Sequence, residues 1–339
     1  MLIRLLKEKY GIQADEEFRI EQYNACRSQN EVYILVPASH MGEEELVELD
    51  QIAEHLKLSG DRNIAGFKKT TEGTPYSEWE DARYAVLGND RLQPRKNGLF
   101  GRKLAKFHFR GRGVSFSVEK TSRIGQWKQL WETRLDQMER VWNDMLFQFD
   151  GENDFDRLFL ESFPYYMGLA ENAIQYIVDT EFDEEPLMND SGTVCHERFL
   201  MNSWGEQYYI KNPFDWVFDH ATRDLAEWTR EKYFSNIKTY EPDLRQFIKE
   251  YESITPLSPF SWRLYYARIL FPLHYFECVE NYYGTSSEQH RNFLKEKLEK
   301  YLQQSGDYEK FLSQFFDLAD RPLPIQQWSI PMPEWLTSK

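Results

Sequence analysis

The spacing of apolar side chains divides the N-terminal part of the chain into helices and strands. Residues 2–10 and 43–58 carry apolar side chains every three or four positions, which is the spacing of an amphipathic helix. Shorter apolar runs without that spacing are typical of strands. We expect four such strands, at residues 17–23, 31–36, 65–71 and 81–87.

Helical spacing dominates the chain from residue 98 onward. We expect seven helices there, at residues 99–109, 127–147, 155–178, 225–234, 244–251, 261–283 and 288–304. The change predicts an α+β protein with a small mixed N-lobe at residues 1–90 and a larger helical C-lobe at residues 91–320. Residues 88–90 would form the hinge between the two lobes.

The Pro- and Trp-rich tail at residues 321–339 forms a third region. Its prolines exclude a helix, but they suit an extended strap that lays apolar side chains on a surface. Either the tail docks on its own C-lobe or it docks on another protein. We expect it to be ordered, because Trp328 and Trp335 would otherwise expose large apolar areas.

Residues 193–225 carry the candidate chemistry. A short buried strand is expected to lead into a turn at residues 196–198, and a second strand is expected at residues 207–210. This layout resembles the catalytic hairpin of kinase-like folds, where one turn supplies a catalytic Asp and the next supplies an Asp that binds magnesium. Arg198 stands at the first of these positions and Asn212 at the second. Because both carboxylates are replaced, we expect no catalytic residue and no metal site.

The N-lobe also lacks the groups that hold a nucleotide. The predicted loop at residues 24–30, where a kinase-like enzyme places its Gly-rich loop, contains no glycine. Val36 stands where the phosphate-binding lysine belongs. Glu45 or Glu48 could be the helix glutamate that pairs with that lysine, but a solvated acidic face is the simpler interpretation. We therefore expect no nucleotide cofactor.

Composition narrows the class of partner. Of the 339 residues, 41% are hydrophobic and 16% aromatic, which suffices for a sizeable core packed through large side chains. The net charge of −15 opposes binding to nucleic acid and to anionic lipid. No signal peptide or membrane-spanning run is visible, so we expect a protein made in the cytoplasm and not inserted in a membrane. Cys26, Cys195 and Cys278 lack the spacing of a zinc site or of a disulfide framework and are expected to be buried thiols.

Four stretches of the chain together resemble one known family. They are SRIGQWKQLWETRLDQMERVW (residues 122–142), CHERF (195–199), DHATRDL (219–225) and ITPLSPFSWRLYYARILFPLHYFECVENYY (254–283). They resemble the CotS-type spore coat proteins of endospore-forming Bacillus-like bacteria, and the shortened hairpin is most similar to that of one endospore coat-associated member. That family is similar to aminoglycoside phosphotransferases and choline kinases. The resemblance therefore implies a protein-kinase-like bilobal fold, synthesis in the mother-cell cytoplasm and a final place in the endospore coat.

The chain departs from the members of this family that keep the phosphotransferase pattern. Those members have an acid two residues after the histidine, an Asn further along and an Asp after the next strand. In this chain the corresponding residues are Arg198, then Asn202 or Ser203, and then Asn212. Two nearby carboxylates, Glu197 and Asp215, could rescue the chemistry only if the hairpin were rebuilt.

Other residues of the pattern are kept. By resemblance, His196, Arg223 and Asp224 form a structural remnant of the site, since such residues brace the catalytic turn through buried hydrogen bonds. Arg198 could join that brace by pairing with Asp215 or Glu197.

The leading hypothesis is a catalytically inactive kinase-like protein that acts by binding, as a structural or assembly component of the endospore coat. Other spore coat proteins would then be its partners, and the oligomeric state stays open. The alternative is a divergent small-molecule phosphotransferase of the aminoglycoside phosphotransferase or choline kinase type. A third hypothesis is a folded cytoplasmic protein whose link to the spore is only inherited from its relatives. Binding of ATP with magnesium distinguishes the first two.

Overall fold

The structure is a computed structural model, and it describes residues 1–28, 31–90, 92–95, 98–148, 151, 153–318, 333 and 336. The chain divides into two compact units. The first unit comprises Met1–Ile124, Ser191–Glu231 and Ser253–Thr255, and the second comprises the described residues of Gly125–Asp190, Lys232–Glu252 and Pro256–Lys339. The N-lobe and C-lobe limits at residues 90 and 320 stay predictions, because this division groups residues by their contacts alone.

An antiparallel sheet of six strands forms one part of the first unit. Its strands are β1 (Glu16–Ile20), β2 (Tyr23–Ser28), β3 (Glu31–Pro37), β4 (Gly66–Phe67), β5 (Ser77–Trp79) and β6 (Ala82–Asn89). They run in the order β1-β2-β3-β6-β4, and β5 pairs with β6 off this path. The central strands β3 and β6 are mostly buried, as their apolar sequences require.

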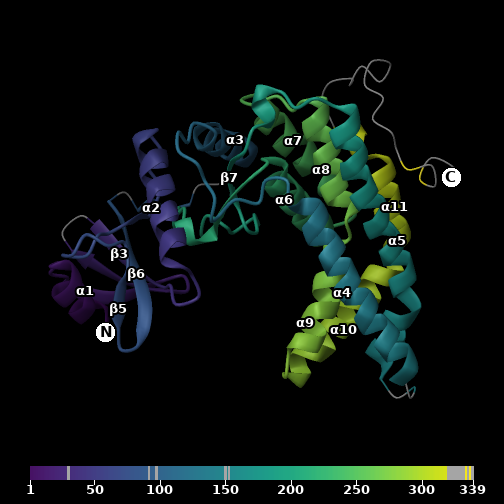
Figure 1. The fold of residues 1–339 in the computed structure, drawn as a ribbon, viewed down its shortest axis with the longest axis horizontal. Coiled ribbons are helices and arrows are strands. Elements are labelled where there is room, and N and C mark those ends of the chain that lie inside the picture. Colours follow the sequence, from purple (N-terminus) through teal and green to yellow (C-terminus); the bar gives the residue numbers. More distant parts are fainter. Residues whose placement is uncertain are drawn as a thin grey trace. The chain divides into compact units, whose positions relative to one another are not determined.

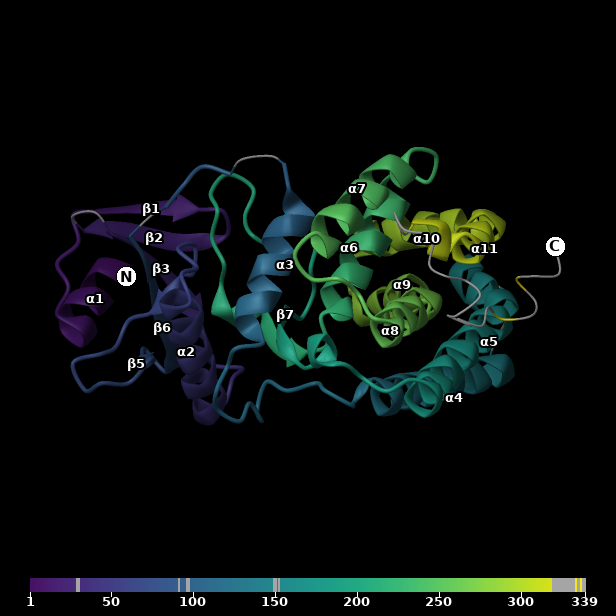
Figure 2. The same ribbon diagram turned by 90° about the horizontal axis from the view of Figure 1, so that it is seen from above.

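Two helices, α1 (Leu2–Tyr10) and α2 (Glu43–Leu58), cover opposite faces of this sheet (Figures 1 and 2). The α1 side chains Leu2, Leu5 and Leu6 pack with Tyr33 and Leu35 of β3 in one buried cluster. This packing explains why apolar positions with helical spacing open the chain.

The rest of the first unit consists of α3 (Phe100–Gly111) and a two-stranded sheet, β7 (Thr193–His196) with β8 (Trp216–Asp219), together with η2 (Pro213–Asp215) and the start of α6 (Thr222–Ser235). α3 packs closely on β7. A Cβ on Gly111 would lie 2.7 Å from the backbone nitrogen of Val194, so only glycine permits this approach. The contact holds β7 against the helix that carries His108.

The second unit is helical. It contains α4 (Trp127–Gln148), α5 (Asp154–Asp183), η1 (Met188–Asp190), the end of α6, α7 (Tyr240–Glu252), α8 (Pro259–Leu270), α9 (Leu273–Gly284), α10 (Glu288–Gln303), α11 (Ser305–Ser313) and η3 (Phe315–Leu318). Stacked aromatic rings join α5 to α9. The ring centroids of Phe155 and Tyr282 are 3.6 Å apart, and those of Tyr166 and Tyr275 are 3.8 Å apart. Large aromatic side chains thus form the core, as predicted from composition.

Two predictions about the ends of elements were wrong. The predicted strand at residues 17–23 and loop at 24–30 are a hairpin instead, in which β1 ends at Ile20 and β2 continues to Ser28. Its turn contains no glycine, although Glu21 adopts a left-handed φ of 55°. The predicted helix at residues 261–283 is split into α8 and α9 before Leu273, because Pro272 cannot continue a helix.

Other predictions concern the cysteines, the membrane and the tail. Cys26, Cys195 and Cys278 are buried and free, as expected. None of the helices among the described residues is both long and apolar enough to cross a membrane. The predicted ordering of the tail, with Trp328 and Trp335, lies outside the described residues.

Candidate functional site

The hairpin that carries the candidate chemistry is built differently from the prediction. β7 pairs with β8, and not with residues 207–210. The backbone of Tyr209 instead donates to Gln93, and Gln207 accepts from Arg95, so this segment is held by the connection that follows β6. η2 therefore leads directly into β8, which places Asp215 immediately before the second strand.

A buried carboxylate, Asp224 at the start of α6, fixes the turn after β7. Asp224 accepts hydrogen bonds from the backbone N–H of His196 (2.8 Å), from Nδ1 of the same residue (2.7 Å) and from Nε2 of His108 (3.0 Å). The indole N–H of Trp204 donates to Nε2 of His196 at 2.9 Å. An indole only donates, so Nε2 of His196 must accept and the ring proton lies on Nδ1. The histidine is thus held from both sides.

Burial and hydrogen bonding determine the protonation of this cluster. Burial alone would raise the pKa of Asp224, but the bonds from His196 and His108 hold the pKa of this carboxyl well below its usual value. Burial lowers the pKa of His108 to about 4, against a smaller opposing effect of Asp224. At neutral pH the cluster therefore contains a carboxylate that accepts from an uncharged His108.

Arg223 completes this brace. Its Nε donates to the carbonyl oxygen of His196 (3.0 Å), and its Nη1 lies 2.7 Å from Oδ2 of Asp219. Its Nη2 contacts Oε1 of Glu197 at 3.2 Å. The contacts bring together His196, Arg223 and Asp224, the three residues that the sequence reading grouped as a structural remnant.

α6 presents a stripe of acids to the turn. Asp224, Glu227 and Glu231 are spaced by three and four residues, which places them on one face of the helix. Asp224 holds His196, Oε2 of Glu227 accepts from Nη1 of Arg198 (2.6 Å), and Glu231 accepts from the backbone N–H of Met201. One helix face therefore holds the turn in three places.

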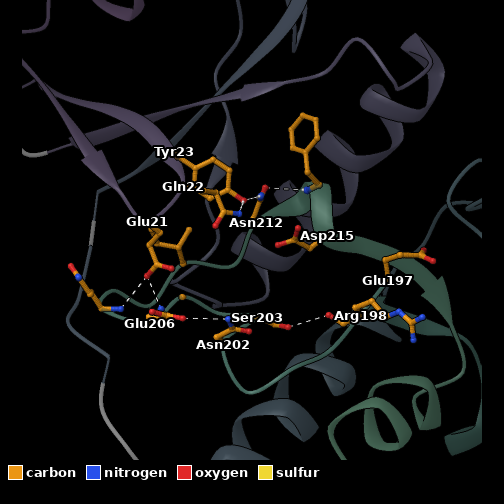
Figure 3. A pocket seen from close by; sticks show the side chains of 14 residues that line it. Glu21, Gln22, Tyr23, Glu197, Arg198, Asn202, Ser203, Glu206, Asn212 and Asp215 are labelled. Atoms are coloured by element: carbon orange, nitrogen blue, oxygen red, sulfur yellow. Dashed lines mark hydrogen bonds between the residues drawn. The ribbon is translucent and has the colours of Figure 1, made fainter. Parts of the chain in front are cut away.

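A pocket of about 480 Å³ lies beside this turn (Figure 3). It is lined by the β1–β2 turn, by the loop after β7 and by η2. The lining residues are Glu21, Gln22, Tyr23, Glu197, Arg198, Asn202, Ser203, Gly205, Glu206, Gln207, Ile210, Asn212, Phe214 and Asp215. Four of them are acidic and one is basic, which disfavours an anion in this pocket.

The two residues predicted to replace catalytic carboxylates, Arg198 and Asn212, both bind other residues of the protein. Arg198 pairs with Glu227, a partner that the sequence did not reveal. The side chain of Asn212 accepts from the backbone N–H of Phe214 (3.1 Å) and donates to the Tyr23 hydroxyl (2.7 Å). Both groups therefore serve the local structure.

The two possible rescue residues differ from each other. Glu197 is exposed and pairs with Arg223. The Asp215 side chain has no hydrogen bond or ion pair with any other described residue, and it lines the pocket (Figure 3). Burial raises the pKa of Asp215 to about 6. Asp215 is the pocket carboxylate best placed to hold a cation or to accept a proton.

The β1–β2 turn closes over the same pocket. Oε1 of Glu21 accepts from the backbone N–H groups of Glu206 (2.6 Å) and Gln207 (3.0 Å), and Tyr23 holds Asn212 (Figure 3). In a kinase-like enzyme this turn would cover the nucleotide phosphates with flexible glycines. Here it presents a carboxylate that is bound to the loop.

Two further predictions concern the N-lobe strand β3 and helix α2. Val36 is buried in β3 beside Ala85, so no cation stands at the predicted lysine position. The solvated acidic face predicted for α2 is wrong for Glu48, whose carboxylate accepts from the backbone of residues 119–121 and from the Thr121 hydroxyl. Burial alone would raise the pKa of Glu48, but these donors lower it. The Glu45 side chain makes no hydrogen bond or ion pair with another described residue.

Three potential metal ligands meet in the buried cluster: His108, Cys195 and Asp224 have ligand atoms within 4.8 Å of one another. The Asp224 oxygens already accept three hydrogen bonds, and the Cys195 thiol contacts the carbonyls of Asp219 and His220. Burial raises the pKa of Cys195, whereas a metal would need its thiolate. The group fits a hydrogen-bonded core better than a metal centre.

Sequence reasoning missed several residues of the site. Glu227, Trp204, His108 and Glu21 were not singled out, although each binds a residue that was. The acidic stripe of α6 was visible as a three- and four-residue spacing in the sequence. The bond between Trp204 and His196 left no such pattern.

Comparison with known sequences agrees with the resemblance seen in four stretches. A family model described as "Spore coat putative kinase YutH" matches residues 3–315. The chain is 42% identical over 334 residues to the "Endospore coat-associated protein YutH" of Bacillus subtilis (strain 168), a match that covers 98% of this chain and 97% of that protein. The predicted similarity to spore coat proteins is confirmed.

Solved structures agree on the fold. An aminoglycoside phosphotransferase from Alicyclobacillus acidocaldarius aligns with a TM-score of 0.64 and 14% identity, over 90% of this chain and 92% of that chain. An AMP-bound spectinomycin phosphotransferase aligns with a TM-score of 0.59 and 15% identity, over 88% and 93%. The predicted α+β, protein-kinase-like fold is confirmed, and at these identities the likeness extends to the fold alone.

Proposed function

Because the chain belongs to the YutH family of kinase-like spore coat proteins, we propose that it is an endospore coat protein that acts by binding and does not transfer phosphate. The proposed location extends to this chain what the name of the B. subtilis relative says of that protein. The proposed inactivity rests on the pocket.

The observation that carries the proposal is the engagement of Arg198 and Asn212. Phosphoryl transfer needs a carboxylate to accept the substrate proton and hard oxygen ligands to hold magnesium. Arg198 brings a positive charge that is tied to Glu227, and the amide of Asn212 is used by Tyr23 and Phe214. Neither group is available to a substrate or a metal without breaking bonds that hold the turn.

The electrostatics of the pocket support the same conclusion. The described lining residues include four acids and one arginine, and the predicted lysine position holds the buried Val36. A triphosphate without metal would be repelled by such a lining. The turn that would cover the phosphates is bound to the opposite loop through Glu21.

One observation favours a second candidate function, a divergent phosphotransferase. Asp215 directly precedes β8, lines the pocket and has no partner among the described side chains. With a pKa near 6, it could serve as a weak base or as one magnesium ligand. Phosphoryl transfer also requires a phosphate-binding lysine, a glycine-rich turn and further metal ligands, and a single carboxylate does not supply them.

The proposal is tested in sporulating cells of the bacterium that produces the chain. The gene is deleted and replaced by wild type or by Asp215→Asn, which removes the one carboxylate that could support chemistry. We expect both forms to be recovered equally in coat extracts of purified spores, with equal coat morphology. If Asp215→Asn accumulates normally but fails to restore the coat, the binding-only function is wrong and the second candidate is favoured.

A further inference from the structure

A second pocket, of about 250 Å³, lies in the first unit and shares no lining residue with the pocket beside the turn. Its walls come from the segment after α2, from the connection between β6 and α3, from α3 itself and from the segment before η2. The lining residues are Asp61, Asn63, Gln93, Pro94, Lys103, Lys106, Arg110, Tyr209 and Lys211.

One face of α3 supplies most of the charge of this pocket. Lys103, Lys106 and Arg110 are spaced by three and four residues and so lie on the same face. Like charges at these spacings repel one another, which destabilises a helix unless an anion lies nearby. Lys106 makes no hydrogen bond or ion pair within the described part of the chain, so its charge is uncompensated there.

The floor of the pocket holds a fourth cation, Lys211, and Asp61, the single acid among the described lining residues. Lys211 lies 2.5 Å from Oδ2 of Asp61, and Nη1 of Arg110 contacts the same oxygen at 3.1 Å. Among the described residues the lining therefore carries four basic side chains and one carboxylate, in a chain whose net charge is −15. Burial lowers the pKa of Lys211, and the positive charges of Arg110 and Lys103 lower it further, against the effect of Asp61.

A buried hydroxyl also lacks a partner in this region. Tyr209 lines the pocket and is 7% exposed, and its hydroxyl has no hydrogen-bond partner within the described part of the chain. Its ring lies 4.8 Å from the ammonium of Lys103. Buried polar groups without a partner are uncommon in native proteins, and a bound water or ligand is a usual explanation.

We propose that this second pocket binds the phosphate group of a small anion, with Lys103 and Lys106 as its contacts and Lys211 and Arg110 as the source of the attracting field. Lysine binds phosphate as a point charge, and the planar guanidinium of arginine can also bind phosphate through two hydrogen bonds. A phosphate dianion also brings more negative charge to these four basic side chains than a single carboxylate does. The small volume suits a group of this size.

The test is calorimetry on the full-length protein at constant ionic strength, with inorganic phosphate, pyrophosphate and citrate as separate ligands and potassium chloride as the salt reference. We expect saturable binding of pyrophosphate or inorganic phosphate with a Kd below about 1 mM, and weaker binding of citrate. Inorganic phosphate and pyrophosphate distinguish a single phosphate from a longer phosphate chain.

Two double variants locate the site. Lys103→Gln/Lys106→Gln should weaken phosphate binding by about tenfold or more, whereas Lys7→Gln/Lys9→Gln on α1 changes the net charge equally and should leave binding unchanged. Lys106→Gln alone changes an exposed side chain and should weaken binding without affecting folding. Arg198→Ala, in the other pocket, should have no effect.

Four results would overturn the proposal. These are no saturable binding of either phosphate ligand, citrate binding as tight as pyrophosphate binding, full binding by Lys103→Gln/Lys106→Gln, and loss of binding in Arg198→Ala. The last result would place the anion beside the turn instead, and would count against the proposed inactivity of that pocket as well.

Discussion

The two sides of the β7–β8 hairpin differ in how their polar groups are satisfied. On the buried side, Asp224 accepts three hydrogen bonds from His196 and His108. On the pocket side, Arg198 and Asn212, which the sequence predicts at the positions of two catalytic carboxylates, both bind other residues of the protein. The residues predicted as a structural remnant thus lie on the side that holds the backbone, whereas the two predicted replacements lie on the side of the pocket.

The pKa shifts of two aspartates show the same contrast. Three donors hold the pKa of Asp224 below its usual value despite burial. Asp215 has no such donor, and burial raises its pKa to about 6. A buried charge that lost its donors would destabilise the fold, whereas a pocket residue can be exchanged at lower cost. Fold and chemistry can therefore separate within one hairpin.

The largest effect is expected from removing the buried brace. Asp224→Ala leaves His196 and His108 without their acceptor in a fully buried site, and should lower the free energy of unfolding by about 3–5 kcal/mol. Chemical denaturation at neutral pH measures this. Asp136→Ala removes an exposed aspartate from α4 and should change stability by less than about 0.5 kcal/mol. Equal effects of the two substitutions would contradict the structural role of Asp224.

A smaller loss of stability is expected on the pocket side, from a reversal of charge. Arg198→Asp would place a carboxylate beside the buried Glu227, and should destabilise the protein by about 2 kcal/mol. Arg198→Ala should cost about 1 kcal/mol, because Arg230 still pairs with Glu227. If Arg198→Asp is as stable as wild type in denaturation, then the pair with Glu227 does not hold the turn.

Substitution of Asp215 should increase the stability of the protein, whereas the substitutions of Asp224 and Arg198 decrease it. The pKa of Asp215 is raised from 3.8 to about 6 in the folded protein. Its ionisation therefore lowers the free energy of unfolding as the pH rises from about 4 through 6, and has no effect below about 4. Asp215→Asn should therefore raise the free energy of unfolding by about 2 kcal/mol at pH 7.5 and leave it unchanged at pH 4. Denaturation curves at the two pH values test this. An equal gain at both would rule out the ionisation as its cause.

The smallest effect is expected at the β1–β2 turn. Glu21→Ala removes the acceptor of the Glu206 and Gln207 N–H groups at an exposed position, and should cost about 0.5 kcal/mol. Hydrogen exchange at these two amides should accelerate, while exchange at His196 stays slow because Asp224 still holds its N–H. Unchanged exchange at residues 206 and 207 would mean that the turn does not close the pocket.

Periodicity predicted most of the fold. α1, α2 and the long helices after residue 98 follow from apolar positions with helical spacing. Strand pairing was predicted less well. Residues 207–210 have an apolar sequence typical of a strand. Their backbone instead forms hydrogen bonds with the backbone of Gln93 and Arg95, more than a hundred residues earlier in the chain. Single-sequence patterns contain no signal for such distant partners.

The candidate site shows the same limit. The spacing of the hairpin motifs predicted that Arg198 and Asn212 replace two carboxylates, and this stays a prediction. The sequence did not reveal which groups bind Arg198 and Asn212, because their partners Glu227 and Tyr23 come from other elements. Placing the second strand wrongly also hid the position of Asp215 directly before β8. Its raised pKa depends on burial, which no motif encodes.

The central claim, that the pocket beside the turn performs no phosphoryl transfer, is tested most directly by calorimetry with ATP and magnesium together with a phosphotransfer assay on wild type, Arg198→Ala and Asp215→Asn. We expect no magnesium-dependent binding at the turn and no turnover in any of the three proteins. Any heat from ATP should be independent of magnesium and should disappear in Lys103→Gln/Lys106→Gln. Micromolar, magnesium-dependent binding of ATP, with turnover that Asp215→Asn abolishes, would contradict the account.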